Sequence, residues 1–270
     1  MQSKSTCIFK AILFCIVFTG LLVVFSFAKS FVPAKFERLA HGIAGTLAAG
    51  FSTFIFLRFE RKRFADIGLV FKQSAPVKFF AGVAAGIIIM GSLTMSVIVF
   101  SDVIIEVNSG SNVLFFLWAT LPLLLLAFME ELGFRGYPLE ILKDKIGIRL
   151  SILITSVLFA LYHIANGWTI SSSFYGPAVW GLLFGLSAVY SKGIAMPTGI
   201  HYGANLTTSA FGAKNYEAVS LWTVKQSHTD KANAGGTELT TILPALALLI
   251  FAVICIELYM RREKRFRTDK

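Results

Sequence analysis

Long apolar stretches are the feature that most constrains what this chain can fold into. Several stretches of about 18 or more residues carry few or no charges, and only 15% of all residues are charged, against about 25% in soluble domains. Such a stretch can cross the roughly 30 Å hydrocarbon core of a bilayer as a helix. The sequence therefore predicts an all-α, polytopic bundle of about eight transmembrane helices. The expected spans are 9–28, 40–58, 78–100, 112–134, 150–166, 174–191, 194–211 and 239–260.

Basic residues lie mainly on one side of this arrangement. Nineteen of the 25 lysines and arginines fall in the termini, the 58–78 and 135–149 connections and the 191–193 turn, whereas the 101–111 connection is acidic. The positive-inside rule then predicts a multi-pass protein of the cell (cytoplasmic) membrane with both termini cytoplasmic. The same distribution explains the net charge of +10 without a nucleic-acid partner. Membrane lipids are the expected partners.

The first apolar stretch has two interpretations. Lys4 and Lys10 precede it, and residues 26–28 resemble the cleavage site of a signal peptide. The run is nearly long enough to span a membrane and no soluble domain follows it, so a transmembrane helix is favoured. We expect N-terminal helices over 1–110, a core of helices over 111–211, and an extracytoplasmic loop, a last helix and a basic tail over 212–270.

Three Gly-x-x-x-Gly pairs lie in the predicted spans and indicate close helix packing. They are Gly82/Gly86, Gly181/Gly185 and Gly199/Gly203. The cysteines form no Cys-x-x-Cys pair, so the sequence indicates neither a zinc knuckle nor a disulfide framework.

Ionisable residues inside the apolar spans indicate a functional site. Placing one acid at the middle of a membrane helix costs about 2.5–3.5 kcal/mol, and Glu130 and Glu131 are adjacent. Glu131 and Arg135 have the spacing and order that favour an ion pair on a helix. This leaves Glu130 as the freer carboxylate.

Two histidines and an amide follow on the next apolar spans. His163 ends one run, and His201 and Asn205 share one face of a later helix. A single histidine on an apolar helix is usually a hydrogen-bonded packing residue. The recurrence of acids, histidines, an arginine and an amide on nearby helices favours a common site instead.

These residues form three motifs in a fixed order. Residues 130–135 read E-E-x-x-x-R, 159–163 read F-x-x-x-H and 201–205 read H-x-x-x-N. In this order on successive apolar spans, they resemble the CPBP family of CAAX-prenyl-protease and bacteriocin-processing (Abi-type) intramembrane peptidases. The segment 63–69 resembles the short segment that precedes the core in many members. The resemblance implies an all-helical bundle with a polar intramembrane cavity.

The resemblance also implies which residues line the active site: Glu130, Glu131, Arg135, His163, His201 and Asn205. The expected activity is hydrolysis of a peptide bond in a membrane-associated substrate. Glu130, helped by His163, would activate a water, and His201 and Asn205 would stabilise the oxyanion. Arg135 would hold Glu131 and the end of its helix in place.

The residues leave the question of a metal open. Two histidines and two glutamates can supply a catalytic zinc site, with Glu130, His163 and His201 as ligands. A metal-free glutamate and histidine mechanism fits the same residues, and the His-Glu-x-x-His spacing of zincins is missing. We therefore carry both a metalloprotease and a metal-free protease as hypotheses.

Two other functions compete with proteolysis. Buried acids and histidines also mark ion paths in transporters, but we find no inverted repeat. A non-catalytic bacteriocin-immunity or scaffold protein would have no need for the full polar set. Neither a serine-type G-x-S-G motif nor a pair of intramembrane aspartates is present. The substrate can be a prenylated protein, a leader peptide or an unprenylated membrane protein, and the sequence does not indicate the oligomeric state.

Overall fold

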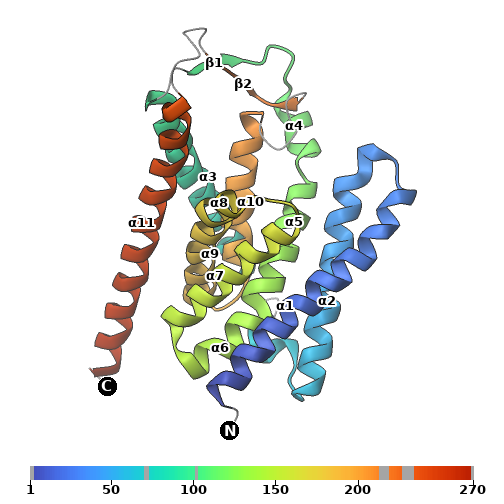
Figure 1. The fold of residues 1–270 in the computed structure, drawn as a ribbon, viewed down its shortest axis with the longest axis vertical. Helices are drawn as coiled ribbons and strands as arrows, with labels where there is room; N and C mark the ends of the chain where they lie inside the picture. The colour runs from blue at the N-terminus through green and yellow to red at the C-terminus, as the bar shows by residue number, and fades with distance from the viewer. Residues whose placement is uncertain (1–2, 70–72, 101–102, 213–218, 227–233, 269–270) are drawn as a thin grey trace.

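The computed structural model describes residues 3–69, 73–100, 103–212, 219–226 and 234–268. It is a helical bundle with a small sheet at one end (Figure 1). The helices are α1 (Lys4–Ser26), α2 (Glu37–Phe59), α3 (Ala75–Phe100), α4 (Val113–Ala119), α5 (Pro122–Glu131), α6 (Tyr137–Ile146), α7 (Ile148–Ala165), α8 (Ile170–Ser173), α9 (Val179–Ser191), α10 (Ala195–Ala210) and α11 (Ala234–Thr268). Shorter turns are η1 (Phe27–Phe31), η2 (Ala34–Phe36), η3 (Phe64–Ile67) and the two π turns η4 (Leu132–Gly136) and η5 (Phe174–Ala178).

All eight expected spans are helical, but they do not all have the length to cross a membrane. Among the described residues, six helical segments are long and apolar enough to cross a membrane. The number is seven if α4 and the helix from Pro122 to Ile146 form one span that is bent by 41°. Pro122 begins the second part of this pair, where its missing N–H costs no hydrogen bond. The expected span 194–211 is α10, which has only 16 residues. The expected connection 135–149 is largely the helix α6.

The outer surface of the bundle is apolar, as a lipid-facing surface requires. On α3, the fully buried residues are the two glycines Gly82 and Gly86, whereas Phe80, Ile88 and Val99 are exposed. Exposing such side chains to water would forfeit the free energy of their burial, about 25 cal/mol per Å². Lipid removes that cost, so the fold is that of a multi-pass membrane protein.

Close packing of α3 on α10 fixes the position of the helix that carries His201. A Cβ on Gly82 or Gly86 would collide with α10, at the carbonyl oxygens of Met196 and Ile200. In the same way, Cβ atoms on Gly199 and Gly203 would collide with carbonyl oxygens of α3. Two of the three Gly-x-x-x-Gly pairs therefore face each other, as small residues at close helix contacts do.

The first helix belongs to the bundle. It buries Phe14 and Phe18 completely and packs against α2 and α6. Phe14 stacks on Tyr137, with ring centroids 5.2 Å apart. The start of α1 and the end of α11 lie at the same end of the bundle, away from the sheet (Figure 1).

A two-stranded sheet joins two connections that are distant in the sequence. Strand β1 (Val103–Val107) pairs antiparallel with β2 (Trp222–Gln226), with Ile105 opposite Val224. The polar segment 212–238 was expected to be a loop. Its described part includes β2, which pairs along one edge with β1.

Candidate active site

An ion pair at the end of α5 forms the buried centre of the site. Arg135 Nη1 lies 3.3 Å from Glu131 Oε1, and both side chains are fully buried. Glu131 ends α5 and Arg135 lies in the π turn η4, a widened turn of the kind that often marks functional sites. The pair expected from the sequence spacing is therefore present. A buried ion pair needs further hydrogen bonds to offset its desolvation.

Those further contacts come from α7 and α9. Arg135 Nη2 donates to the carbonyl oxygen of Gly181, 3.2 Å away. The guanidinium carbon lies 4.5 Å from the ring centroid of Phe159 and 5.2 Å from that of Phe184. Arg135 is thus held by one carboxylate, one carbonyl and two aromatic faces, which suits its planar charged group.

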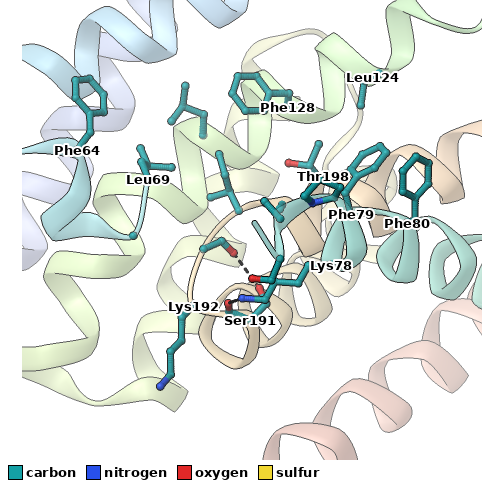
Figure 2. Close-up of a pocket in the computed structure, with 18 of the residues that line it drawn as sticks. Phe64, Leu69, Lys78, Phe79, Phe80, Leu124, Phe128, Ser191, Lys192 and Thr198 are labelled. Atoms are coloured by element: carbon teal, nitrogen blue, oxygen red, sulfur yellow. Dashed lines mark hydrogen bonds between the residues drawn. The ribbon is translucent and has the colours of Figure 1, made fainter. Parts of the chain in front are cut away.

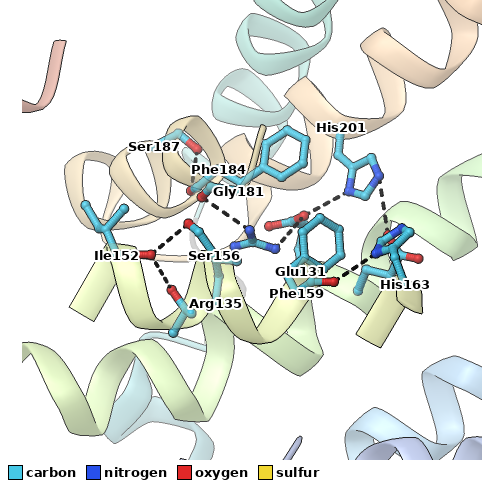
Figure 3. Close-up of polar contacts among 12 residues, drawn as sticks. Glu131, Arg135, Ile152, Ser156, Phe159, His163, Gly181, Phe184, Ser187 and His201 are labelled. Atoms are coloured by element: carbon cyan, nitrogen blue, oxygen red, sulfur yellow. Dashed lines mark hydrogen bonds and ion pairs between the residues drawn. The ribbon is translucent and has the colours of Figure 1, made fainter. Parts of the chain in front are cut away.

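His201 connects the two glutamates, and Figure 3 shows its contact with Glu131. Its Nδ1 lies 2.8 Å from Glu131 Oε1, and its Nε2 lies 3.4 Å from Glu130 Oε2. The contact of Nδ1 with Glu131 has hydrogen-bond length, whereas the longer contact of Nε2 with Glu130 lies within ion-pair range.

Phe184 is a second support for His201. Its ring stacks on the imidazole with centroids 4.6 Å apart and planes inclined by 15°. The same ring faces Arg135, so one side chain of α9 contacts two members of the polar cluster. The position of His201 is therefore fixed by packing as well as by hydrogen bonds.

His163 lies at the edge of this cluster, on α7. Its Nδ1 lies 2.9 Å from the carbonyl oxygen of Phe159. A carbonyl can only accept, so Nδ1 carries the hydrogen, and in the neutral ring Nε2 is an acceptor. The ring of Phe159 lies 4.6 Å from His163 and 6.1 Å from His201, which places both histidines around one aromatic side chain.

Glu130 and Asn205 complete the expected set. The side chain of Glu130 is 13% exposed, so it is the more accessible of the two acids. Asn205 lies one turn beyond His201 on α10 and is half-buried. The structure thus brings Glu130, Glu131, Arg135 and His201 into contact, with His163 beside them and Asn205 on the adjacent turn.

Sequence reasoning did not identify three contributors. Phe184 and the Gly181 carbonyl contact Arg135, and Trp168 lies against His163 with centroids 5.0 Å apart. The Gly181/Gly185 pair was a signal of close packing, and a Cβ on Gly181 would lie 3.0 Å from Arg135 Nη2. Nothing in the spacing of Phe184 or Trp168 distinguishes them from ordinary apolar residues.

The donor geometry does not suit a metal ion. Among the described residues, no group of three or more His, Cys, Asp and Glu side chains is arranged to hold one. Both nitrogens of His201 face carboxylates, and His163 Nδ1 faces a carbonyl. A zinc site formed by Glu130, His163 and His201 would need His201 to release Glu130 or Glu131.

An apolar groove of about 680 Å³ lies beside the site (Figure 2). Its wall on α5 and η4 includes Leu125, Phe128 and Leu132, of which the last two flank the two glutamates in sequence. Its wall on α10 includes Thr198, one turn before His201. Thr198 is buried, and its Oγ1 has no hydrogen-bond partner among the described residues.

The segment 63–69 forms the opposite wall of this groove. Phe64 and Leu69 line it, and Gly68 turns the chain with a φ of 75°, which favours glycine. A Cβ atom on Gly68 would lie 3.3 Å from the carbonyl oxygen of Lys192, and one on Gly193 would lie 3.2 Å from the carbonyl oxygen of Gly68. This segment therefore packs tightly on the α9–α10 turn. The segment therefore helps to shape the groove.

Comparison with known proteins assigns the central part of the chain. Residues 112–207 match the family described as Rce1-like, type II CAAX prenyl endopeptidase Rce1-like. The match confirms the family expected from the three motifs and lies within the expected core, 111–211. No curated protein matches the chain. At family level, the match supports a CAAX-type intramembrane protease.

Proposed function

We propose that this chain, whose residues 112–207 match the Rce1-like family, is an intramembrane endopeptidase that hydrolyses a peptide bond with a glutamate-activated water. The observation that carries the proposal is the meeting of Glu130, Glu131 and His201 from two helices in a buried cluster. A cluster with this many ionisable groups is costly inside a membrane protein, and such groups are normally functional.

In the proposed mechanism, each residue has a separate role. Glu130, the more exposed acid, accepts a proton from the attacking water, and His163 Nε2 orients that water. Glu131 and Arg135 position His201. His201 and Asn205 then donate hydrogen bonds to the oxyanion, because the 3.4 Å contact from His201 to Glu130 is long enough to be exchanged for one to substrate.

The proposed hydrolysis needs no reactant other than the peptide and one water molecule. The water oxygen forms a bond to the carbonyl carbon, and its proton passes to Glu130. When the carbon–nitrogen bond breaks, Glu130 returns the proton to the leaving amine. No step requires a metal.

The apolar groove supports a substrate that carries a lipid or a strongly apolar segment. It passes from the 63–69 segment to Thr198 on α10, next to the polar cluster. A chain bound there would lie within one helical turn of His201. We propose that the substrate is a prenylated protein tail. The alternatives are a leader peptide and an unprenylated membrane protein.

The test is cleavage of fluorogenic peptides by the purified protein in detergent. The panel contains a farnesylated CAAX peptide and the same peptide without the lipid, each tested on wild type, Glu130→Gln and the matched control Glu140→Gln. Glu140 lies outside the site, where it pairs with Lys143. We expect wild type and Glu140→Gln to cleave and Glu130→Gln to be inactive but folded. Retained cleavage by Glu130→Gln would remove Glu130 from the role of base.

We also infer that both termini are cytoplasmic. The proposal rests on the basic residues at that end of the bundle and on the positive-inside rule. In a variant lacking Cys7, Cys15 and Cys255, single cysteines at Ser109 and Lys192 should be labelled from opposite sides of the membrane. Both positions are exposed. Labelling from the same side would contradict the orientation.

A further inference from the structure

A second cavity, of about 550 Å³, lies at the other end of the molecule from the apolar groove. It is formed where the turn between α1 and α2 faces the break between α4 and α5. Its charged lining comes from Lys29, Lys35, Glu37 and Arg38, with His41 one turn further along α2. None of these residues belongs to the polar cluster around Glu131.

The charges around this cavity favour an anion. Among the described residues that line it, three cations, Lys29, Lys35 and Arg38, accompany one carboxylate, Glu37. Lys29 Nζ and Glu37 Oε1 are 3.8 Å apart, too far for a hydrogen bond. His41 Nδ1 is buried and has no hydrogen-bond partner among the described residues. A phosphate group offers several acceptor oxygens and negative charge, which suit lysine, arginine and histidine donors.

The apolar part of the cavity and its surroundings indicate a lipid. The other described lining residues are apolar: Ala34, Ala119, Pro122, Leu126 and Val219. Around the mouth, Phe27 and Phe31 are 72% and 89% exposed. Large exposed apolar rings beside lysines are expected where a helical hairpin meets the membrane interface, because lysine extends its charge toward the headgroups. A ligand there needs both an anionic head and an apolar tail.

We propose that this cavity binds the headgroup of an anionic phospholipid. Its phosphate lies between Lys35 and Arg38, and its acyl chains begin over Pro122 and Leu126. Basic pockets between transmembrane helices bind lipid headgroups on the cytoplasmic side of membranes, and this cavity offers the same combination of charge and apolar contact at the opposite end of the bundle. The proposal does not depend on peptidase activity, because it rests on the charge and shape of a separate cavity.

The test is lipid-dependent thermal stability of the full chain in neutral detergent. Phosphatidylglycerol and phosphatidylcholine with the same acyl chains are added at equal concentration, and inorganic phosphate is added alone. We expect phosphatidylglycerol to raise the Tm by about 5 °C more than phosphatidylcholine, because a ligand that binds only the folded state stabilises it. Inorganic phosphate should give no such rise.

Two variants locate the effect. The double variant Lys35→Gln/Arg38→Gln should lose most of the difference between the two lipids, whereas Lys225→Gln should keep it. Lys225 is a matched control, since it pairs with Glu106 at the sheet, outside the cavity. If the double variant does not fold, the single variant Lys35→Gln takes its place in the comparison of the two lipids. Lys35 is exposed on a short turn, so its substitution should not prevent folding.

Four results would overturn the proposal. Equal stabilisation by the two lipids would mean that no anionic headgroup is recognised. An unchanged response of the Lys35 variants, or an equal loss in Lys225→Gln, would place the effect elsewhere. A full rise with inorganic phosphate alone would assign the cavity to a soluble anion.

Discussion

His201 Nδ1 lies 2.8 Å from Glu131 Oε1, although the two residues are 70 positions apart in the sequence. The same oxygen accepts a hydrogen bond from Arg135 Nη1 on the adjacent turn. Glu131 therefore contacts both Arg135, on the adjacent turn, and His201, on the helix α10 much later in the sequence. In the proposed mechanism, Glu131 positions His201, whereas Glu130 is the acid that faces the substrate.

The two adjacent glutamates should respond differently to the same substitution. Glu131→Gln leaves the buried guanidinium of Arg135 without its counter-charge, and we expect a loss of about 3 kcal/mol in the free energy of unfolding. Glu130→Gln should change stability by less than about 1 kcal/mol while abolishing cleavage. Denaturant unfolding in detergent micelles measures both. Equal destabilisation by the two variants would contradict the division of roles.

Packing of α3 on α10 should be as important as the polar contacts. Gly86→Ala would drive a Cβ into the Ile200 carbonyl, next to His201, so we expect a loss of about 2 kcal/mol or more and a lower kcat. Gly91→Ala on the same helix is the matched control, because a Cβ there meets nothing within 4 Å. It should be neutral or slightly stabilising. Thermal unfolding and turnover of both variants test the contact.

Chelation should leave cleavage unchanged. The ring nitrogens of His201 face Glu130 and Glu131, so a metal would have to displace one of these contacts. We expect full activity after exhaustive dialysis against a chelator, with no stoichiometric metal in the purified protein. A loss that zinc restores would revive the metalloprotease hypothesis and require a rearranged site.

A pH effect is expected at the end of α2, outside the membrane-spanning segments. Burial opposes ionisation of Glu60, but hydrogen bonds from Lys10 and Tyr137 and the charges of Lys10 and Lys62 outweigh it and hold the pKa of Glu60 below its ordinary value. Lys10 Nζ and Tyr137 Oη lie 2.8 and 3.0 Å from the carboxylate.

A lowered pKa stabilises the fold above the ordinary carboxyl range, and this stabilisation is lost as the pH falls through the lowered value. Glu60→Gln should therefore be less stable than wild type at pH 7, by about 1 kcal/mol. The difference should shrink in acid. Tm measured against pH for the two proteins tests this, and a constant difference across the range would rule it out.

The sequence alone determined the class of fold and the identity of the polar residues. Uncharged runs require a membrane environment wherever they occur, and the spacing of Glu131 and Arg135 places both on one helix face. These are local properties, so they need no knowledge of how the helices pack. The motifs in order also predicted the family that residues 112–207 match.

Tertiary structure decided everything that depends on helices meeting. It placed His201 against Glu131, stacked Phe184 on His201, and turned the glycines of α3 toward those of α10. It also made α10 a short helix and paired β1 with a strand more than 100 residues away. Helix tilt and rotation are set by many packing contacts together, and one apolar residue on a membrane helix resembles another until its neighbour is known.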